Sequence, residues 1–168
     1  MTGVAPSSER LEIAVPIAAA AHAPSPATLV TVGLGSCVAI AIHATAAPAG
    51  ALAHILLPEA SPAEEALHPA RFARSAVPHL LSLFARAGVT GPFEARLIGG
   101  ASMFEEMLPS STIALGVRNV AAARAACEAA GIPIVAEATG GRFGRSVWFD
   151  VTDGQVLIRS VAHDDRTI

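Results

Sequence analysis

Short apolar segments bounded by glycine, proline or polar residues recur along the chain and predict a protein built largely from β-strands. Several alternate apolar with polar residues or are rich in β-branched side chains, as strands are. The two segments that flank the Pro48–Gly50 loop, VAIAIH and ALAHILLP, are instead continuously apolar. Because they are short and bounded by breakers, we expect them to be buried strands. The predicted strands cover residues 11–15, 28–34, 38–43, 51–58, 93–100, 132–138, 146–151 and 155–161.

Two segments carry a helical pattern. Apolar residues of the segment 71–87 recur at i, i+3 and i+4 spacing, which predicts an amphipathic helix that Gly88 ends and Pro78 distorts. The alanine-rich segment 120–130 predicts a second helix, with Asn119 as its N-cap.

The order of these elements indicates the fold class. Strands, helix, strand, helix and strands follow one another without the strict alternation of a doubly wound sheet, so we expect a mixed α/β domain of the α+β kind. We expect residues 18–26 to be a connection and residues 59–70 a loop with one helical turn. The prediction is one domain over residues 11–162, between a flexible tail at 1–10 and a C-terminal tail at 163–168.

Composition removes several classes of function. The chain has 168 residues, 52% of them apolar, and a formal net charge of −3, which suits one folded domain. All its basic residues are arginines, and they are scattered, so no nucleic-acid footprint is visible. The absence of lysine excludes Schiff-base chemistry and a P-loop. Because every aspartate lies at or beyond position 150, the first 149 residues hold no aspartate-rich metal centre.

The sequence favours a cytoplasmic location. No apolar stretch approaches the roughly 20 residues of a membrane span, and two cysteines are too few for a disulfide framework. The alternative is secretion, since Arg10 precedes a mildly apolar stretch that ends in the AxA-like AHA at 21–23. Glu12 and Pro16 interrupt that stretch and argue against a signal peptide.

Cys37 is the first candidate for chemistry. It follows the turn-like GLGS, and a glycine-flanked turn at the end of a strand can expose a nucleophilic thiolate. The free backbone N–H groups of such a turn can stabilise an oxyanion. The alternative interpretation is a small buried hydrophobic residue, which also fits Cys127 in its alanine-rich helix.

A general base is available near Cys37 in the sequence. If 37–43 and 50–57 are adjacent antiparallel strands, His54 can face Cys37, although a buried structural histidine fits the same pattern. A third group that orients the imidazole would be an aspartate or asparagine, and the only asparagine is Asn119. The hydroxyl of Thr31, six residues before Cys37, could do this more weakly.

Other sites have little support. The chain has no CxxC or HExxH motif and no two-histidine, one-carboxylate spacing on a confident helix, so we expect no metal site. GLGS lacks the third glycine of a dinucleotide fingerprint. GGRFGR at 140–145 places two arginines among glycines, where they could contact an anion or a partner, or simply form a turn before a strand.

Five sequence blocks in a fixed order resemble the chemoreceptor glutamine deamidase family, CheD. The similarity runs from about Thr28 to Ile158. Its fold, as the resemblance implies it, is two packed β-sheets with helices outside, similar to deamidating bacterial toxins. The blocks are TVGLGSCVAI (31–40), GALAHILLP (50–58), IGGASMF (98–104), LGVRNV (115–120) and TGGRFGRSVWFD (139–150).

The resemblance implies a role for each matching position. Cys37 would be the nucleophile, His54 the general base and Thr31 the third member of the triad. The glycine-containing loops would line the oxyanion and substrate site, at Gly35, Ser36, Gly99 and Gly100. The implied activity is hydrolysis of receptor glutamine side chains to glutamate without a cofactor, and the resemblance also suggests weak methylesterase activity at the same site.

The resemblance also implies partners and leaves an alternative. The protein substrates would be methyl-accepting chemotaxis receptors, and a CheC-type phosphatase would be a second partner. A regulatory module that only docks on such a phosphatase or on receptors is the rival interpretation, and a redox-sensing thiol is a weaker one. The chain departs from the family pattern at His43, Ala138 and Arg74, which bears on recognition rather than on the triad.

Overall fold

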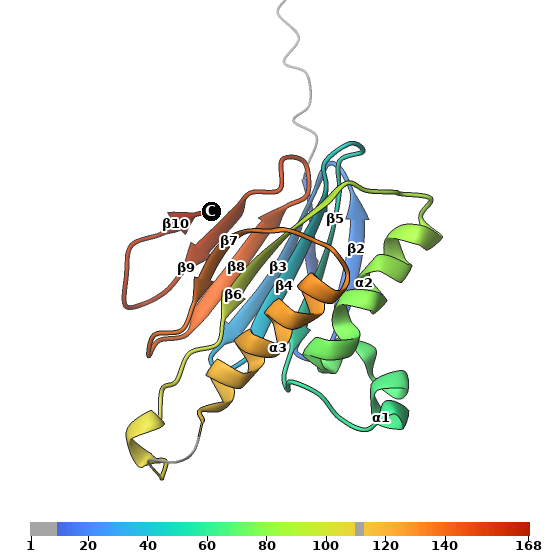
Figure 1. Ribbon diagram of the computed structural model, residues 1–168. Helices are drawn as coiled ribbons and strands as arrows, with labels where there is room; N and C mark the ends of the chain where they lie inside the picture. The colour runs from blue at the N-terminus through green and yellow to red at the C-terminus, as the bar shows by residue number, and fades with distance from the viewer. Residues whose placement is uncertain (1–9, 110–112) are drawn as a thin grey trace, which may run out of the picture.

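The computed structural model describes residues 10–109 and 113–168, which form three layers (Figure 1). Two β-sheets pack face to face, and a pair of helices covers the outer face of one of them. This confirms the expected fold class, two mixed sheets with helices outside. The tail predicted at residues 1–10 falls, except for Arg10, outside the described residues.

The first sheet has five strands in the order β1-β3-β8-β9-β10. The pair β1–β3 is parallel, and the other neighbours are antiparallel. Buried and partly exposed residues alternate along β8, because one face of this sheet packs against the second sheet and the other faces outward. Its strands are β1 (Leu11–Ala14), β3 (Ala27–Leu34), β8 (Arg145–Asp150), β9 (Val156–Arg159) and β10 (Arg166–Thr167).

The second sheet lies in the middle of the molecule. Its order is β2-β5-β4-β6-β7, with β6 and β7 parallel and the other neighbours antiparallel. Every residue of β4 and β5 is buried, because one face contacts helices and the other contacts the first sheet. This explains the two continuously apolar segments of the sequence. Its strands are β2 (Ala20–Pro24), β4 (Val38–Ala44), β5 (Ala49–Ile55), β6 (Phe93–Gly99) and β7 (Ile134–Thr139).

The helices α2 (Ala73–Arg86) and α3 (Leu115–Ala129) lie side by side on the second sheet (Figure 1). One apolar core lies between these helices and the sheet, and the other lies between the two sheets. The short helices are α1 (Pro62–Leu67) and the 3-10 turns η1 (Pro69–Arg71) and η2 (Glu105–Met107). None of the helices in the described residues is long and apolar enough to cross a membrane.

Three local predictions were wrong or incomplete. The connection expected at 18–26 contains β2, which pairs with β5 through five register positions. Asn119 is not an N-cap, because α3 begins four residues earlier and buries this side chain completely. The C-terminal tail expected at 163–168 includes β10, and Ile168 exchanges two backbone hydrogen bonds with Val156.

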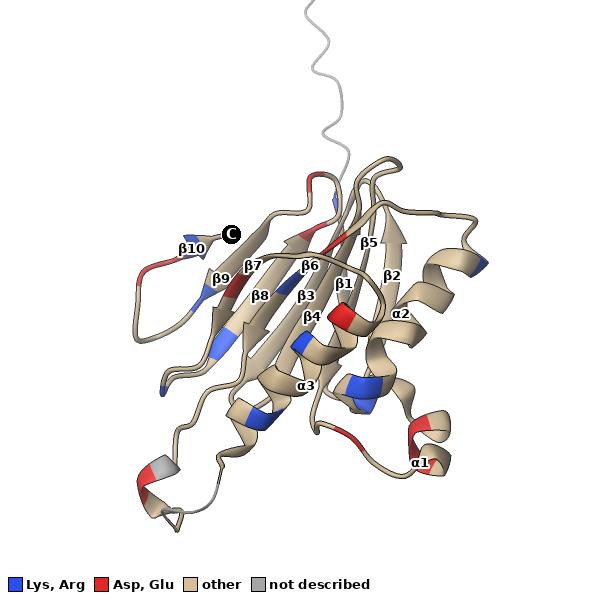
Figure 2. Ribbon diagram, viewed as in Figure 1, with Lys and Arg blue, Asp and Glu red and all other residues tan. Residues whose placement is uncertain are grey.

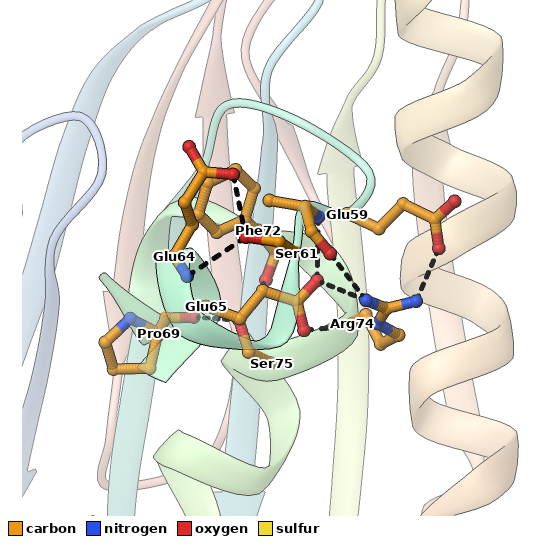
Figure 3. Close-up of polar contacts among 9 residues, drawn as sticks. Glu59, Ser61, Glu64, Glu65, Pro69, Phe72, Arg74 and Ser75 are labelled. Atoms are coloured by element: carbon orange, nitrogen blue, oxygen red, sulfur yellow. Dashed lines mark hydrogen bonds and ion pairs between the residues drawn. The ribbon is translucent and has the colours of Figure 1, made fainter. Parts of the chain in front are cut away.

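Hydrogen bonds from Arg74 stabilise the segment that connects β5 to α2 (Figure 3). Arg74 donates hydrogen bonds to the carboxylates of Glu59 and Glu65 and to the carbonyl of Ala60. Burial raises the pKa of Glu65, but the Ala60 N–H and Arg74 outweigh it, so this pKa lies below its ordinary value. Because Glu59 and Ala60 lie in the short connection between β5 and α1, this network fixes the chain near the strand that carries His54.

Candidate active site

The two candidate catalytic residues lie on neighbouring strands of the central sheet. β4 and β5 pair antiparallel, which is the condition that the Cys37–His54 hypothesis required, and Ala39 stands opposite His54. Cys37 precedes β4 by one residue, so its side chain points to the same face as Ala39 and lies diagonally across from His54. Both side chains face the first sheet and are buried, with exposures of 6% for Cys37 and 1% for His54. The fold therefore brings the thiol and the imidazole into one layer.

Thr31 reaches the imidazole from the opposing sheet. Its Oγ1 lies 2.7 Å from Nδ1 of His54 and 2.7 Å from the carbonyl oxygen of Val15. A carbonyl can only accept, so the Thr31 hydroxyl donates its proton to Val15 and accepts one from His54 Nδ1–H. This fixes the tautomer in which Nε2 carries the lone pair. Nε2 is buried and has no hydrogen-bond partner among the described residues.

Burial shifts the two ionisable groups in opposite directions. Desolvation raises the pKa of the Cys37 thiol, and a hydrogen bond from its own backbone N–H acts against this shift. Desolvation lowers the pKa of His54, which keeps the imidazole neutral near pH 7. A neutral imidazole with a free Nε2 is the form that can accept a proton from a thiol.

The loop before Cys37 is held by the end of β6. Gly100 N donates to the Cys37 carbonyl at 2.7 Å, and Ala101 N donates to the Gly35 carbonyl at 2.8 Å. Both Gly99 (φ 114°) and Gly100 (φ 67°) have positive φ. A β-carbon on Gly99 would lie 2.3 Å from the Cys37 carbonyl oxygen, so only glycine allows this approach.

Some backbone N–H groups of the two predicted oxyanion loops, 35–37 and 99–100, already donate hydrogen bonds, and others do not. The N–H of Gly35 donates to Gly33 at 3.1 Å, and the N–H of Gly100 is bonded to Cys37. Within the described residues, the amides of Ser36 and Cys37 donate to no backbone carbonyl. The Cys37 N–H already contacts its own sulfur, so the Ser36 N–H is the freer donor, and both are candidates for an oxyanion hole beside the sulfur.

Asn119 contacts the backbone on both sides of the candidate pair, an arrangement that the sequence did not reveal. Its Nδ2 donates to the Ser36 carbonyl at 2.9 Å and to the Leu56 carbonyl at 3.0 Å. Ser36 precedes the candidate nucleophile, and Leu56 follows His54 by two residues. One buried amide on α3 thus connects the two segments that carry the pair. The sequence signal was the single asparagine within LGVRNV, which we interpreted as a helix cap and named as the only asparagine that could orient the imidazole.

The turn that holds Ser36 also borders a small cavity of about 160 Å³. Met103, Phe104 and Leu108 line one side of it, and Phe104 is 68% exposed. Exposed apolar side chains of this size beside a buried thiol form a surface suited to contact with another protein. Among the described residues, no group of three or more His, Cys, Asp or Glu side chains could hold a metal ion.

Comparison with known proteins gives the family. The sequence model described as "CheD chemotactic sensory transduction" matches residues 56–160. The chain is 41% identical to a "Probable chemoreceptor glutamine deamidase CheD" of Clostridium kluyveri over 151 residues, which cover 89% of this chain and 93% of that protein. The chain belongs to the CheD family. Two further relatives so described are 44% identical (Geobacter metallireducens, "CheD 2"; 79% and 83% covered) and 37% identical (Methanosarcina barkeri; 90% and 99% covered).

The three positions at which the resemblance indicated a departure from the CheD pattern have structural contacts of their own. His43 Nε2 lies 3.1 Å from the Val151 carbonyl, and its ring meets Phe149 edge-on. Ala138 stands opposite Ile98 in the β6–β7 pair and packs against the core between the sheets. Arg74 fastens the segment after β5, as described above. All three contribute to the fold of this CheD protein, and none touches the Thr31–His54 contact.

Proposed function

We propose that this protein is a chemoreceptor glutamine deamidase that hydrolyses glutamine side chains of methyl-accepting chemotaxis receptors to glutamate. The family membership and the names of the relatives support the reaction. The observation that supports these catalytic residues is the 2.7 Å contact between Thr31 Oγ1 and His54 Nδ1. It leaves His54 Nε2 free on the face shared with Cys37. Cytoplasmic location follows from the substrate, because the receptor glutamines would be modified on that side.

In the proposed first half-reaction, Cys37 attacks the substrate. His54 Nε2 takes the thiol proton, and the sulfur forms a bond to the side-chain amide carbon. The amides of Ser36 and Cys37 stabilise the oxyanion of the tetrahedral intermediate. His54 then protonates the amide nitrogen, the carbon–nitrogen bond breaks, and ammonia leaves a thioester on Cys37.

The second half-reaction regenerates the thiol. His54 removes a proton from a water molecule, whose oxygen attacks the thioester carbon. The carbon–sulfur bond breaks, and the thiolate recovers its proton from His54. The product is a glutamate carboxyl group, which adds one negative charge to the receptor. The scheme uses no cofactor. A methyl ester would differ only in its leaving group, so we expect weak methylesterase activity at the same site.

A single comparison of variants tests this proposal. Purified receptor cytoplasmic segment is incubated with wild type, Cys37→Ala or Cys127→Ala, and ammonia and product mass are measured. We expect wild type and Cys127→Ala to raise the product mass by about one unit per site, the amide-to-acid change. Cys37→Ala should fold normally and release none. Equal activity of Cys37→Ala and wild type would refute the assignment.

A CheC-type phosphatase is the second partner that we propose, since the family resemblance implies it. The exposed side chains of Met103 and Phe104 beside the catalytic turn offer a contact surface for such a protein. Pull-down with the purified phosphatase tests the interaction. If the phosphatase binds while no receptor segment is deamidated, the regulatory module becomes the better description of the protein.

A further inference from the structure

Arg145 is a buried cation without an acidic partner. It begins β8 and is 7% exposed, and its side chain shares the face of Val147 and Phe149 that meets the second sheet. Its guanidinium stacks on the Phe143 ring at 4.3 Å, and its hydrogen bond to the Gly99 carbonyl is long, at 3.5 Å. No ion pair among the described residues includes Arg145. Buried charges are ordinarily paired, so this exception needs a reason.

A second arginine faces the same space. Arg145 and Arg166 both line a cavity of about 520 Å³ between the ends of β7, β8 and β9, and Figure 2 shows basic positions on β8, β9 and β10. Like Arg145, Arg166 joins no ion pair in the described part of the chain. Burial, and then the charge of Arg166, lower the pKa of Arg145. An anion between the two guanidinium groups would relieve this repulsion.

The remaining polar groups of the cavity suit an anion as well. Ser160 and His163 add hydrogen-bond donors to the lining. Of the two carboxylates there, Glu137 is already held by two hydrogen bonds from Arg124, at 2.6 and 2.8 Å. The other, Asp164, is exposed at the rim.

The cavity adjoins the candidate catalytic turn through Gly99. The Gly99 carbonyl accepts the Arg145 hydrogen bond and one from Gly140 N at 2.9 Å. On its other side, Gly99 pairs with Val38, the residue after Cys37. Arg145 therefore contacts the end of β6, the strand that pairs with β4 directly after the candidate nucleophile, and Arg166 lines the same cavity.

We propose that this cavity is a subsite for an acidic side chain of the protein substrate, close to the glutamine that is deamidated. The inference rests on the proposed function. A planar guanidinium recognises a carboxylate through two parallel hydrogen bonds, and a second arginine strengthens the contact. The volume exceeds that of a small anion and leaves room for the side chain that carries the carboxylate. The subsite makes the enzyme selective for glutamines with acidic neighbours.

Binding to inactive protein tests the subsite apart from catalysis. In the Cys37→Ala background, affinity is measured for a labelled receptor cytoplasmic segment and for the same segment with the acidic residues around its glutamine replaced by serine. We expect the acidic version to bind about tenfold tighter or more, the effect of one charge-assisted contact. Arg145→Gln and Arg166→Gln should each reduce this ratio to about twofold. Arg86→Gln, which removes an exposed charge at the end of α2, is the matched control and should keep the ratio.

The outcomes separate the two proposals. Arg166 is exposed, so its variant decides the question even if Arg145→Gln fails to fold. Equal affinity for both segments, or a ratio that survives both arginine changes, would overturn the subsite. Ammonia release is then measured on the same segments with Cys37 present. Selective binding without any ammonia release would refute the proposed function and leave the subsite standing.

Discussion

Replacement of Thr31 by valine removes one hydroxyl and leaves the shape of the side chain almost unchanged. Two hydrogen bonds of 2.7 Å disappear, one with His54 Nδ1 and one with the Val15 carbonyl. Each contributes about 0.5–1.5 kcal/mol, and both former partners remain buried and unpaired, so we expect a loss of about 2–3 kcal/mol in the free energy of unfolding. For a chain of this size, that lowers Tm by about 5–10 °C.

The same hydroxyl selects the tautomer of the proposed base, so the rate should fall as well. Without Thr31 as acceptor, nothing favours the proton on Nδ1, and Nε2 no longer faces Cys37 with a lone pair in every molecule. An orienting contact of about 1–3 kcal/mol corresponds to a decrease of about 5- to 150-fold in kcat. KM should change little, since Thr31 is buried behind the imidazole.

The assay is ammonia release from a receptor segment, with Tm measured in parallel. Thr31→Ser is the matched control, because it keeps the hydroxyl and should retain most of the activity. A Thr31→Val protein with a lowered Tm and wild-type kcat would refute the reasoning, since the hydroxyl would then serve only the fold. A serine variant as slow as the valine variant would contradict it too.

Other expectations concern the surroundings of this contact. Asn119→Leu removes the donor of two carbonyls and should lower stability by about 1–3 kcal/mol, visible in denaturant unfolding, together with kcat. Iodoacetamide at pH 8 should modify Cys37 long before Cys127, whose pKa burial raises to about 11, as peptide mass spectrometry would show. Because burial lowers the pKa of His54, the imidazole should become protonated only below about pH 6.5, the ordinary histidine value. A plot of kcat/KM against pH should therefore decrease only on the acid side of that value. Glu65→Gln should lower Tm at pH 7. The difference from wild type should shrink as the pH falls below about 4, because a depressed carboxyl pKa stabilises the fold fully only above the ordinary glutamate pKa.

The sequence predicted those strands and helices that are determined by the pattern of residues within the element itself. The short apolar segments around the Pro48–Gly50 loop predicted both strands. Their antiparallel pairing was only a condition of the Cys37–His54 hypothesis, and a connection this short favours it. The i, i+3, i+4 pattern predicted α2 to within two residues at its start. β2 was missed because its sequence, AAHAP, has weak strand propensity, and its pairing with β5 and its packing against α2 stabilise it.

In the candidate site, too, the sequence indicated single residues but not the contacts between distant segments. Cys37, His54 and Thr31 stood out through their blocks, but the contact between Thr31 and His54 joins two different sheets. Asn119 contacts carbonyls 83 and 63 residues away along the chain. A polar residue near the start of a helical pattern resembles a cap, and only the packing of α3 on the second sheet shows that it is interior.

Burial of the pair has a consequence for how the proposed reaction begins. Desolvation raises the pKa of Cys37 and lowers that of His54, so both shifts favour the neutral thiol and neutral imidazole over the ion pair. The free protein therefore holds little thiolate, unlike sites in which a nearby cation keeps the sulfur ionised. Proton transfer from Cys37 to Nε2 becomes favourable when the sulfur bonds to the substrate carbon. The negative charge then lies on the substrate oxygen, where the N–H groups of Ser36 and Cys37 can stabilise it. In the proposed mechanism, we therefore expect substrate binding, rather than a standing thiolate, to activate Cys37.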